Sequence, residues 1–225
     1  MGQPVNPNGA IFLSAGVPDA SKPNFVAKAD IAAISAAVSA LLYVTLGRRR
    51  LVWGGHPAIT PMVWAHAEAM GVDYGAWVKL YQSAFFEDEF PEETALFNNV
   101  VVTPEVPKDM AASLAIMREQ MLDDTSFGAA VFVGGMQGIM DEFELFKAKA
   151  PDAAILPIMT AGGAAEIIGQ QIEADSEFAQ QRDYVALLHH QLDINPGERR
   201  YSSPAQQPET IAERLQHPPS PSAQG

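Results

Sequence analysis

The chain has 225 residues, 48 % of them hydrophobic, which is enough for one α/β domain with a buried core. It has no cysteine, so disulfides and thiolate metal sites are excluded, and a reducing, cytoplasmic compartment is expected. The formal net charge of −13 disfavours a nucleic-acid polymer as partner, although local amides and cations can still hold a small phosphorylated ligand.

No segment is expected to enter a membrane. The apolar run at residues 31–46 has only sixteen residues, many of them alanine and serine, and it stops at Gly47-Arg48-Arg49-Arg50. A spanning helix needs about 20 predominantly apolar residues. The N-terminus also lacks the basic stretch of a secretory signal, so a membrane partner is not predicted.

Strand-like apolar runs alternate with helical patterns between residues 10 and 194. Strands are expected at 10–16, 51–53, 78–86, 99–106, 129–135 and 155–160. Helices are expected at 31–46, 60–70, 110–121, 138–150, 162–174 and 183–192. This alternation predicts an α/β, Rossmann-like fold with a parallel sheet and helices on both faces.

The two ends of the chain differ in composition from its centre. Residues 1–9 are expected to be flexible, and residues 10–194 to form a single domain. Residues 195–225 contain six prolines, many glutamines and serines, and little apolar content apart from a possible turn at 209–215. We therefore expect a mostly disordered tail there.

Three of the predicted strands end in loops with unusual chemistry. In open parallel sheets, ligands bind where the carboxyl ends of the strands lead into helices. The first loop offers Ser14 and Gly16, and the second is Gly54-Gly55-His56, followed by a helix that begins at Thr60. Glycines let a ligand approach the main chain, and a helix start attracts anions. The structural alternative is a pair of tight turns with a structural histidine.

The third loop combines glycines with acidic residues. Gly134-Gly135 end a strand, Gly138 opens the next helix, and Asp141-Glu142 follow one turn later. Such a glycine nest would take a phosphate, while a carboxylate would take ribose hydroxyls or stabilise positive charge at the anomeric carbon. The alternative is a glycine turn before a solvated acidic helix end. No metal site or cofactor is expected, and the acidic run at 87–93 is expected to be a solvated loop, or to border the crevice or an interface.

The segment from Met117 to Phe146 resembles the LOG proteins, phosphoribohydrolases whose signature is an arginine-bearing helix, a strand and PGGxGTxxE. The wider pattern is similar to the SLOG superfamily, in particular a bacterial group tied to conflict systems. The resemblance implies that Gly134 and Gly135 are the signature pair and that Arg118 contacts the substrate near the scissile bond. The final glutamate corresponds to Asp141 without a gap, or to Glu142 with one inserted residue.

The signature is also altered in this chain. Val133 replaces its proline, Gln137-Gly138 stand where Gly-Thr is expected, and Glu119 replaces the lysine after the arginine. These changes favour a sensor of a nucleotide or an NAD- or ADP-ribose-derived ligand over an N-glycosidase that uses Arg118 with Asp141 or Glu142. The resemblance suggests that such a sensor would act in a bacterial antiviral signalling system. A third alternative is an assembly protein with a vestigial site. A homo-oligomer and an effector protein partner are expected from the resemblance.

Overall fold

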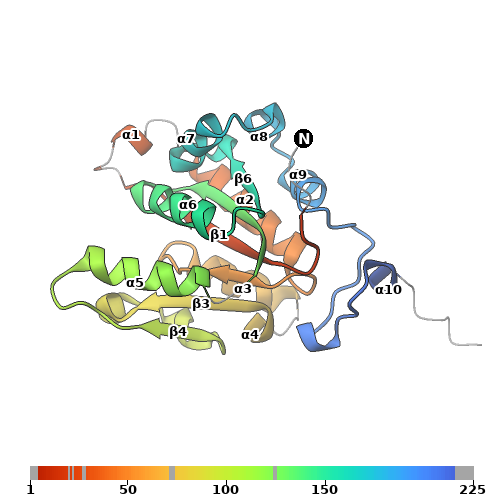
Figure 1. The fold of residues 1–225 in the computed structure, drawn as a ribbon, viewed down its shortest axis with the longest axis horizontal. Coiled ribbons are helices and arrows are strands. Elements are labelled where there is room, and N and C mark those ends of the chain that lie inside the picture. The colour runs from red at the N-terminus through yellow and green to blue at the C-terminus, as the bar shows by residue number, and fades with distance from the viewer. Residues whose placement is uncertain are drawn as a thin grey trace, which may run out of the picture.

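The computed structural model describes residues 5–19, 21, 23–26, 29–70, 74–123 and 126–215. Six strands form one sheet in the order β4-β3-β2-β1-β5-β6, and every neighbouring pair is parallel (Figure 1). The strands are β1 (Ala10–Gly16), β2 (Leu51–Trp53), β3 (Val78–Ser83), β4 (Val100–Thr103), β5 (Phe127–Gly134) and β6 (Ala154–Ile158). The predicted Rossmann-like α/β fold is confirmed.

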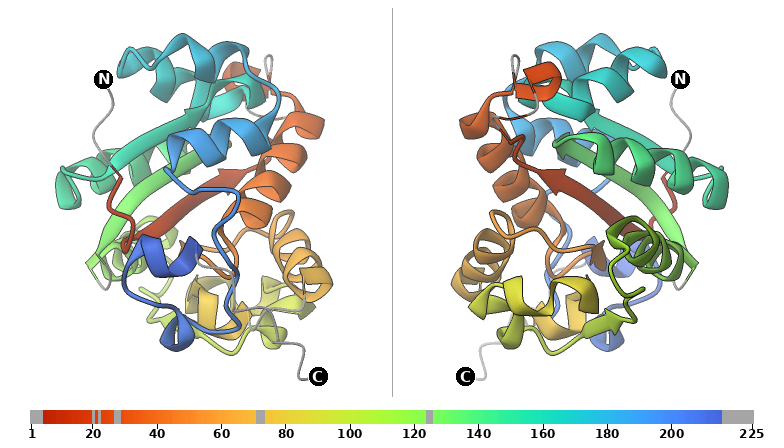
Figure 2. Two further views of the ribbon diagram at one scale, coloured as in Figure 1. Left: turned by 90° about the vertical axis from the view of Figure 1, so that its right-hand side faces the viewer. Right: turned by 90° about the vertical axis from the view of Figure 1, so that its left-hand side faces the viewer.

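Helices cover both faces of this sheet (Figure 2). One face carries α2 (Ile31–Thr45), α3 (Thr60–Met70), α8 (Ser176–Gln180) and α9 (Tyr184–Gln191). The other carries α5 (Met110–Asp123), α6 (Gln137–Lys149) and α7 (Gly163–Gln171). The shorter helices are α1 (Pro23–Val26), α4 (Tyr74–Trp77) and α10 (Ile211–Leu215). No helix in the described ranges is long and apolar enough to cross a bilayer.

Alternation along each strand assigns its side chains to the two faces. Ile11 and Leu13 of β1 pack into the cluster with α2, whereas Phe12 packs into the cluster with α6. Successive strand side chains point to opposite faces, so both faces are apolar when both are covered. Ser14 is on the same side as Phe12, so its hydroxyl points toward α6.

The chain reverses its direction across the sheet between β1 and β5. Strands β1 to β4 are added outward on one side, and β5 then returns to pair with β1 on the other. Loops leaving β1 and β5 consequently diverge at the carboxyl edge and leave a crevice between them. That crevice is where open α/β sheets bind ligands.

Two predicted strands are shorter than expected. The strand expected at 78–86 ends at Ser83, and Ala84–Glu89 forms the 3-10 helix η1. The Ser83 hydroxyl accepts the Phe85 amide at 3.4 Å, which starts that helix. The aromatic pair after Ser83 has strand-like composition, but it turns over the carboxyl edge of the sheet. A second 3-10 helix, η2 (Glu92–Leu96), precedes β4, which covers only four of the residues expected at 99–106.

The expectation of a mostly disordered tail differs from the structure over residues 195–215. This part packs against the domain, with the 3-10 helix η4 (Pro204–Gln206) and α10. Trp77 Nε1 donates to the Tyr201 carbonyl at 2.9 Å, and Arg48 Nε donates to the Glu198 carbonyl at 2.7 Å. The segment packs on the domain with few apolar side chains, because Arg48 donates to its backbone carbonyls. Composition does not reveal such contacts.

The start of the chain takes part in the same contacts. Residues 5–9, expected to be flexible, lie beside the C-terminal segment, and Arg214 Nη2 donates to Asn8 Oδ1 at 2.6 Å. Residues 1–4 and 216–225 lie outside the described residues.

Candidate functional site

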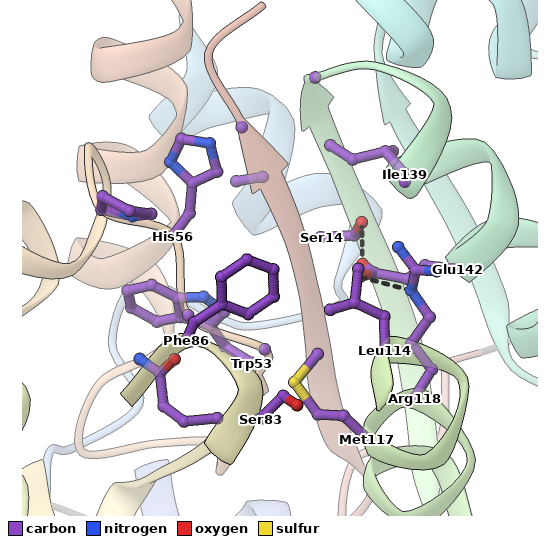
Figure 3. Close-up of a pocket in the computed structure, with 18 of the residues that line it drawn as sticks. Ser14, Trp53, His56, Ser83, Phe86, Leu114, Met117, Arg118, Ile139 and Glu142 are labelled. Atoms are coloured by element: carbon purple, nitrogen blue, oxygen red, sulfur yellow. Dashed lines mark hydrogen bonds and ion pairs between the residues drawn. The ribbon is translucent and has the colours of Figure 1, made fainter. Parts of the chain in front are cut away.

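A cavity of about 290 Å³ lies at the carboxyl edge of the sheet, across the β1–β5 switch point (Figure 3). Its walls come from the ends of β1, β2 and β3, from η1, from α5, and from the loop after β5 with the first turns of α6. We call this cavity the cleft. All three of the loops singled out in the sequence contribute to it.

A carboxylate in a poorly hydrated setting forms the polar centre of the cleft. Ser14 Oγ donates to Glu142 Oε2 at 2.6 Å, and Arg118 Nε donates to Glu142 Oε1 at 3.4 Å (Figure 3). Loss of water contact raises the pKa of Glu142, while the charge of Arg118 and the Ser14 hydrogen bond act in the opposite direction. Three residues remote in sequence are thereby brought to one point.

The phase of α6 explains why Glu142 rather than Asp141 faces the cleft. The buried face of this helix is made by Ile139, Phe143 and Phe146. At about 100° per residue, Glu142 lies within roughly 60° of Ile139, whereas Asp141 lies about 160° away. Asp141 is 48 % exposed and does not line the cleft, and its Oδ2 accepts a hydrogen bond from Arg118 Nη1 at 3.3 Å. The alignment with one inserted residue therefore gives the carboxylate that enters the cleft.

Gly138 makes room for the arginine. A Cβ at this position would lie 2.9 Å from Arg118 Nη2. The guanidinium therefore lies directly against the first turn of α6, where it reaches both Glu142 and Asp141. Gly138 lines the cleft, and the absence of its side chain positions Arg118.

The Gly134-Gly135 pair, predicted as a phosphate nest, makes main-chain contacts within the protein, and Gly135 lines the cleft. Both residues have positive φ, 62° and 71°. The Gly135 amide donates to the Gly16 carbonyl at 2.7 Å, and the Gly135 carbonyl accepts the Ala164 amide at 3.0 Å. Gly134 is absent from the cleft lining, and a Cβ there would meet Ile34 at 2.6 Å. Close packing and positive φ therefore require glycine at both positions, and the Gly135 amide is already used by the Gly16 carbonyl.

The start of α6 offers further main-chain donors at this edge. The first amides of a helix, here those of Gln137 and Gly138, have no intrahelical acceptor. The N-cap residue Met136 makes no side-chain capping bond. Gly138 lines the cleft, so this helix start presents donors and the positive end of its dipole near Glu142.

The second loop contributes Gly54, Gly55 and His56 to the cleft. His56 Nδ1 accepts the Ala58 amide at 3.2 Å, which assigns the ring hydrogen of the neutral form to Nε2. Burial lowers the pKa of His56, so the ring is uncharged at neutral pH. It can donate a hydrogen bond to a ligand, but it brings no positive charge.

Thr60 and Gly55 have structural roles beside that loop. Thr60, predicted as a ligand-binding residue, does not line the cleft, and its buried hydroxyl donates to the His56 carbonyl at 3.0 Å. Gly55 has φ of 64°, and a Cβ there would lie 2.6 Å from Gln82 Nε2. The first loop is less constrained: a Cβ on Gly16 would meet His56 at 3.4 Å, an ordinary contact.

Sequence reasoning missed the aromatic wall of the cleft. Trp53 and Phe86 lie on the side opposite Glu142, and Gln82 also lines the cavity (Figure 3). Gln82 is 7 % exposed, and its side-chain amide makes no hydrogen bond to another described residue. Phe86 belongs to η1, and Glu89 from the acidic run also reaches the cleft. The available signal was Phe86, which directly precedes this acidic run, and Phe90, which interrupts it; both line the cleft.

No metal centre is formed by the part of the chain that the structure describes. It contains no group of three or more His, Cys, Asp or Glu side chains that could hold an ion. The titratable side chains that line the cleft are the carboxylates of Glu142 and Glu89, the guanidinium of Arg118 and the neutral ring of His56. Aromatic rings and the first amides of α6 also contribute to its lining.

The strand order and the position of the cleft define a Rossmann-like protein with a cavity at the switch point. The chain belongs to the SLOG cluster3 family, whose model matches residues 24–192. The resemblance to the SLOG superfamily predicted from the sequence is thus confirmed. Membership of this family indicates binding or processing of a nucleotide-related ligand.

Other comparisons add little. None of the curated proteins compared matches the chain. One solved structure, described as that of a "putative dihydrodipicolinate synthase family protein from Coccidioides immitis", is similar at 15 % identity with a TM-score of 0.25. The match covers 67 % of this chain and 51 % of the other, so it spans about half of that protein. A TM-score this low carries no argument about fold or function.

Proposed function

We propose that this protein is a sensor that binds a nucleotide, or an NAD- or ADP-ribose-derived ligand, in the cleft. The observation that carries the proposal is Glu142, a poorly hydrated carboxylate held by Ser14 and Arg118 and facing an aromatic wall. An acceptor-only carboxylate suits ribose hydroxyls, and flat apolar surfaces suit a base.

Each part of such a ligand has a matching part of the cleft. The base would contact Phe86 and Trp53, and its polar edge would meet the Gln82 amide. The ribose would donate to Glu142. A phosphate would lie at the start of α6, where free amides and the helix dipole favour an anion.

The charges of the cleft restrict the phosphate count. Arg118 is the sole Lys or Arg among its lining residues, and it already pairs with Glu142 and Asp141. Glu89 adds a second carboxylate to the lining, and His56 is uncharged at neutral pH. A ligand with few phosphates is therefore favoured over a triphosphate.

One observation favours the hydrolytic alternative. Burial raises the pKa of Glu142, as happens to carboxyl groups that take part in proton transfer. In a phosphoribohydrolase or N-glycosidase, Glu142 would stabilise the oxocarbenium-like state and Arg118 would hold the phosphate. The altered signature, with Val133 in place of proline, favours the sensor over this alternative.

The two functions are separated by binding and turnover measured on the same variants. Wild type, Glu142→Gln and the control Glu144→Gln are tested for thermal shifts with AMP, NAD and ADP-ribose, and each mixture is chromatographed for free base. Glu144 is on the same helix but accepts from Gln171 at 3.0 Å, away from the cleft. Loss of a charged hydrogen bond should weaken binding by about 1–3 kcal/mol in Glu142→Gln only.

A sensor binds without releasing base, whereas base release that is lost in Glu142→Gln would establish the hydrolase. Equal affinity of both variants for every ligand, or no binding by wild type, would refute the assignment of the cleft. For the sensor, we further propose that ligand binding changes self-association or contact with an effector protein. Sedimentation of wild type with and without the bound nucleotide tests the first of these.

A further inference from the structure

A second cavity lies at the opposite, amino-terminal edge of the sheet. It measures about 330 Å³ and is lined by Arg48, Arg49 and Arg50 from the turn before β2, by Arg214 of α10, and by polar residues of both chain ends. The C-terminal segment, which contributes part of the lining, lies beside the start of β1 (Figure 2). We call it the arginine cavity. The proposed function makes no use of it.

Positive charge is in excess there. Four arginines line the cavity, while the neighbouring carboxylates are Glu209 in the lining and the buried Glu198. Glu198 accepts from Arg49 at 2.6 and 3.1 Å, and it lies 3.5 Å from Arg214. Two positive charges are thus left over, in a chain whose net charge is −13.

Neutral acceptors take up most of the remaining donors. The three nitrogens of Arg48 donate to the carbonyls of Glu198, Val44 and Pro196 at 2.7 to 3.1 Å. Carbonyl oxygens satisfy hydrogen bonds but do not neutralise a charge. Desolvation by burial and, to a lesser extent, the nearby Arg200 lower the pKa of Arg48 to about 10.

Two arginines keep unused donors. Arg49 is 2 % exposed, and its Nε is buried without a hydrogen-bond partner among the described residues. Arg50 is exposed, and its guanidinium forms no hydrogen bond or ion pair with the described part of the chain. Buried polar groups are almost always paired, so a missing partner at this cavity is informative.

We propose that the arginine cavity binds a small, multiply charged phosphate anion. Guanidinium groups match phosphate oxygens in geometry and charge, and four of them line this one cavity. The anion would bridge Arg50, before β2, and the side-chain amide of Gln207 in the C-terminal segment, both of which line the cavity. Its binding would therefore hold residues 195–215 on the domain.

Inorganic pyrophosphate is the probe. The melting temperature and the dissociation constant of the full chain are measured with pyrophosphate and with sodium chloride at equal ionic strength. Wild type should be stabilised by pyrophosphate beyond the chloride control. Arg50→Gln should weaken pyrophosphate binding about tenfold, as expected for one charge-assisted hydrogen bond, and Arg50→Glu should weaken it further.

Two controls locate the anion. Lys108→Gln removes one exposed charge at the other edge of the sheet and should bind pyrophosphate like wild type. Arg118→Gln removes the cation of the cleft and should also bind like wild type. The proposal is overturned by the absence of a pyrophosphate-specific shift in wild type, by equal binding in Arg50→Gln, or by a loss confined to Arg118→Gln, which would place the anion in the cleft.

Discussion

Replacement of Glu198 by glutamine tests how the C-terminal segment is held. Glu198 is 2 % exposed, and its carboxylate accepts hydrogen bonds from Arg49 Nη1 and Nη2 at 2.6 and 3.1 Å. Arg214 Nη1 lies 3.5 Å from the same carboxylate. Glutamine keeps the size of the side chain but removes the one fully buried carboxylate of this cluster, so two buried guanidiniums lose their counter-charge.

The expected cost follows from the burial of these groups. The side chains of Arg49, Arg214 and Glu198 are 1 %, 3 % and 0 % exposed, so solvent screens them little. Removal of one partner from a buried ion pair costs about 3–5 kcal/mol. At about 2–4 °C per kcal/mol for a chain of this size, the melting temperature should fall by about 6–20 °C.

Differential scanning calorimetry of wild type, Glu198→Gln and Glu209→Gln measures this effect. Glu209 belongs to the same segment but is exposed, so its substitution should change stability by no more than about 0.5 kcal/mol. If Glu198→Gln melts within about 2 °C of wild type, the ionic cluster does not hold the segment and the reasoning from burial fails.

Three further predictions concern the cleft. Gly135→Val should lower the free energy of unfolding by at least about 2 kcal/mol in chemical denaturation, because φ is 71° and a Cβ would lie 2.0 Å from Ile139 Cδ1; unchanged stability would contradict the packing role. Gly138→Ala should displace Arg118 and weaken nucleotide binding about tenfold without lowering the melting temperature, since alanine favours a helix; unaltered affinity in calorimetric titration would exclude the positioning role. Burial raises the pKa of Glu142, so the folded state holds this proton more tightly than the unfolded state and the group's contribution to stability falls as pH rises through its raised pKa. The stability of Glu142→Gln relative to wild type should therefore be more favourable at about pH 8 than at about pH 4. A difference in melting temperature between the two proteins that is the same at both pH values would contradict this prediction.

The cleft carboxylate illustrates how far a local pattern reaches. The sequence left Asp141 and Glu142 as alternatives, because the family signature fits either with or without a gap. The apolar spacing of Ile139, Phe143 and Phe146 already contains the answer, since helix geometry places Glu142 beside that face. This inference requires only that the apolar face of the helix is the buried one.

Glycines show the opposite limit. The pattern at Gly134 and Gly135 predicted main-chain donors for a phosphate, yet the Gly135 amide is used by the Gly16 carbonyl at 2.7 Å. Gly138 makes room for Arg118, which is twenty residues earlier in the chain. At Gly134 and Gly138, the atom that a Cβ would meet belongs to a distant element, which the local sequence does not show.

What the sequence determined by itself was the parallel α/β sheet and the edge of it that carries the cleft, because strand and helix periods and the glycine-rich strand ends are local properties. Tertiary structure alone decided that Phe86 turns into the cleft, and that residues 195–215 pack on Arg48 and Arg49 instead of remaining a tail. The contacts of residues 195–215 with Arg48 and Arg49 join positions some 150 residues apart, as the Arg49–Glu198 pair does. Their stability comes from buried charge and carbonyl acceptors, which neither periodicity nor apolar content records.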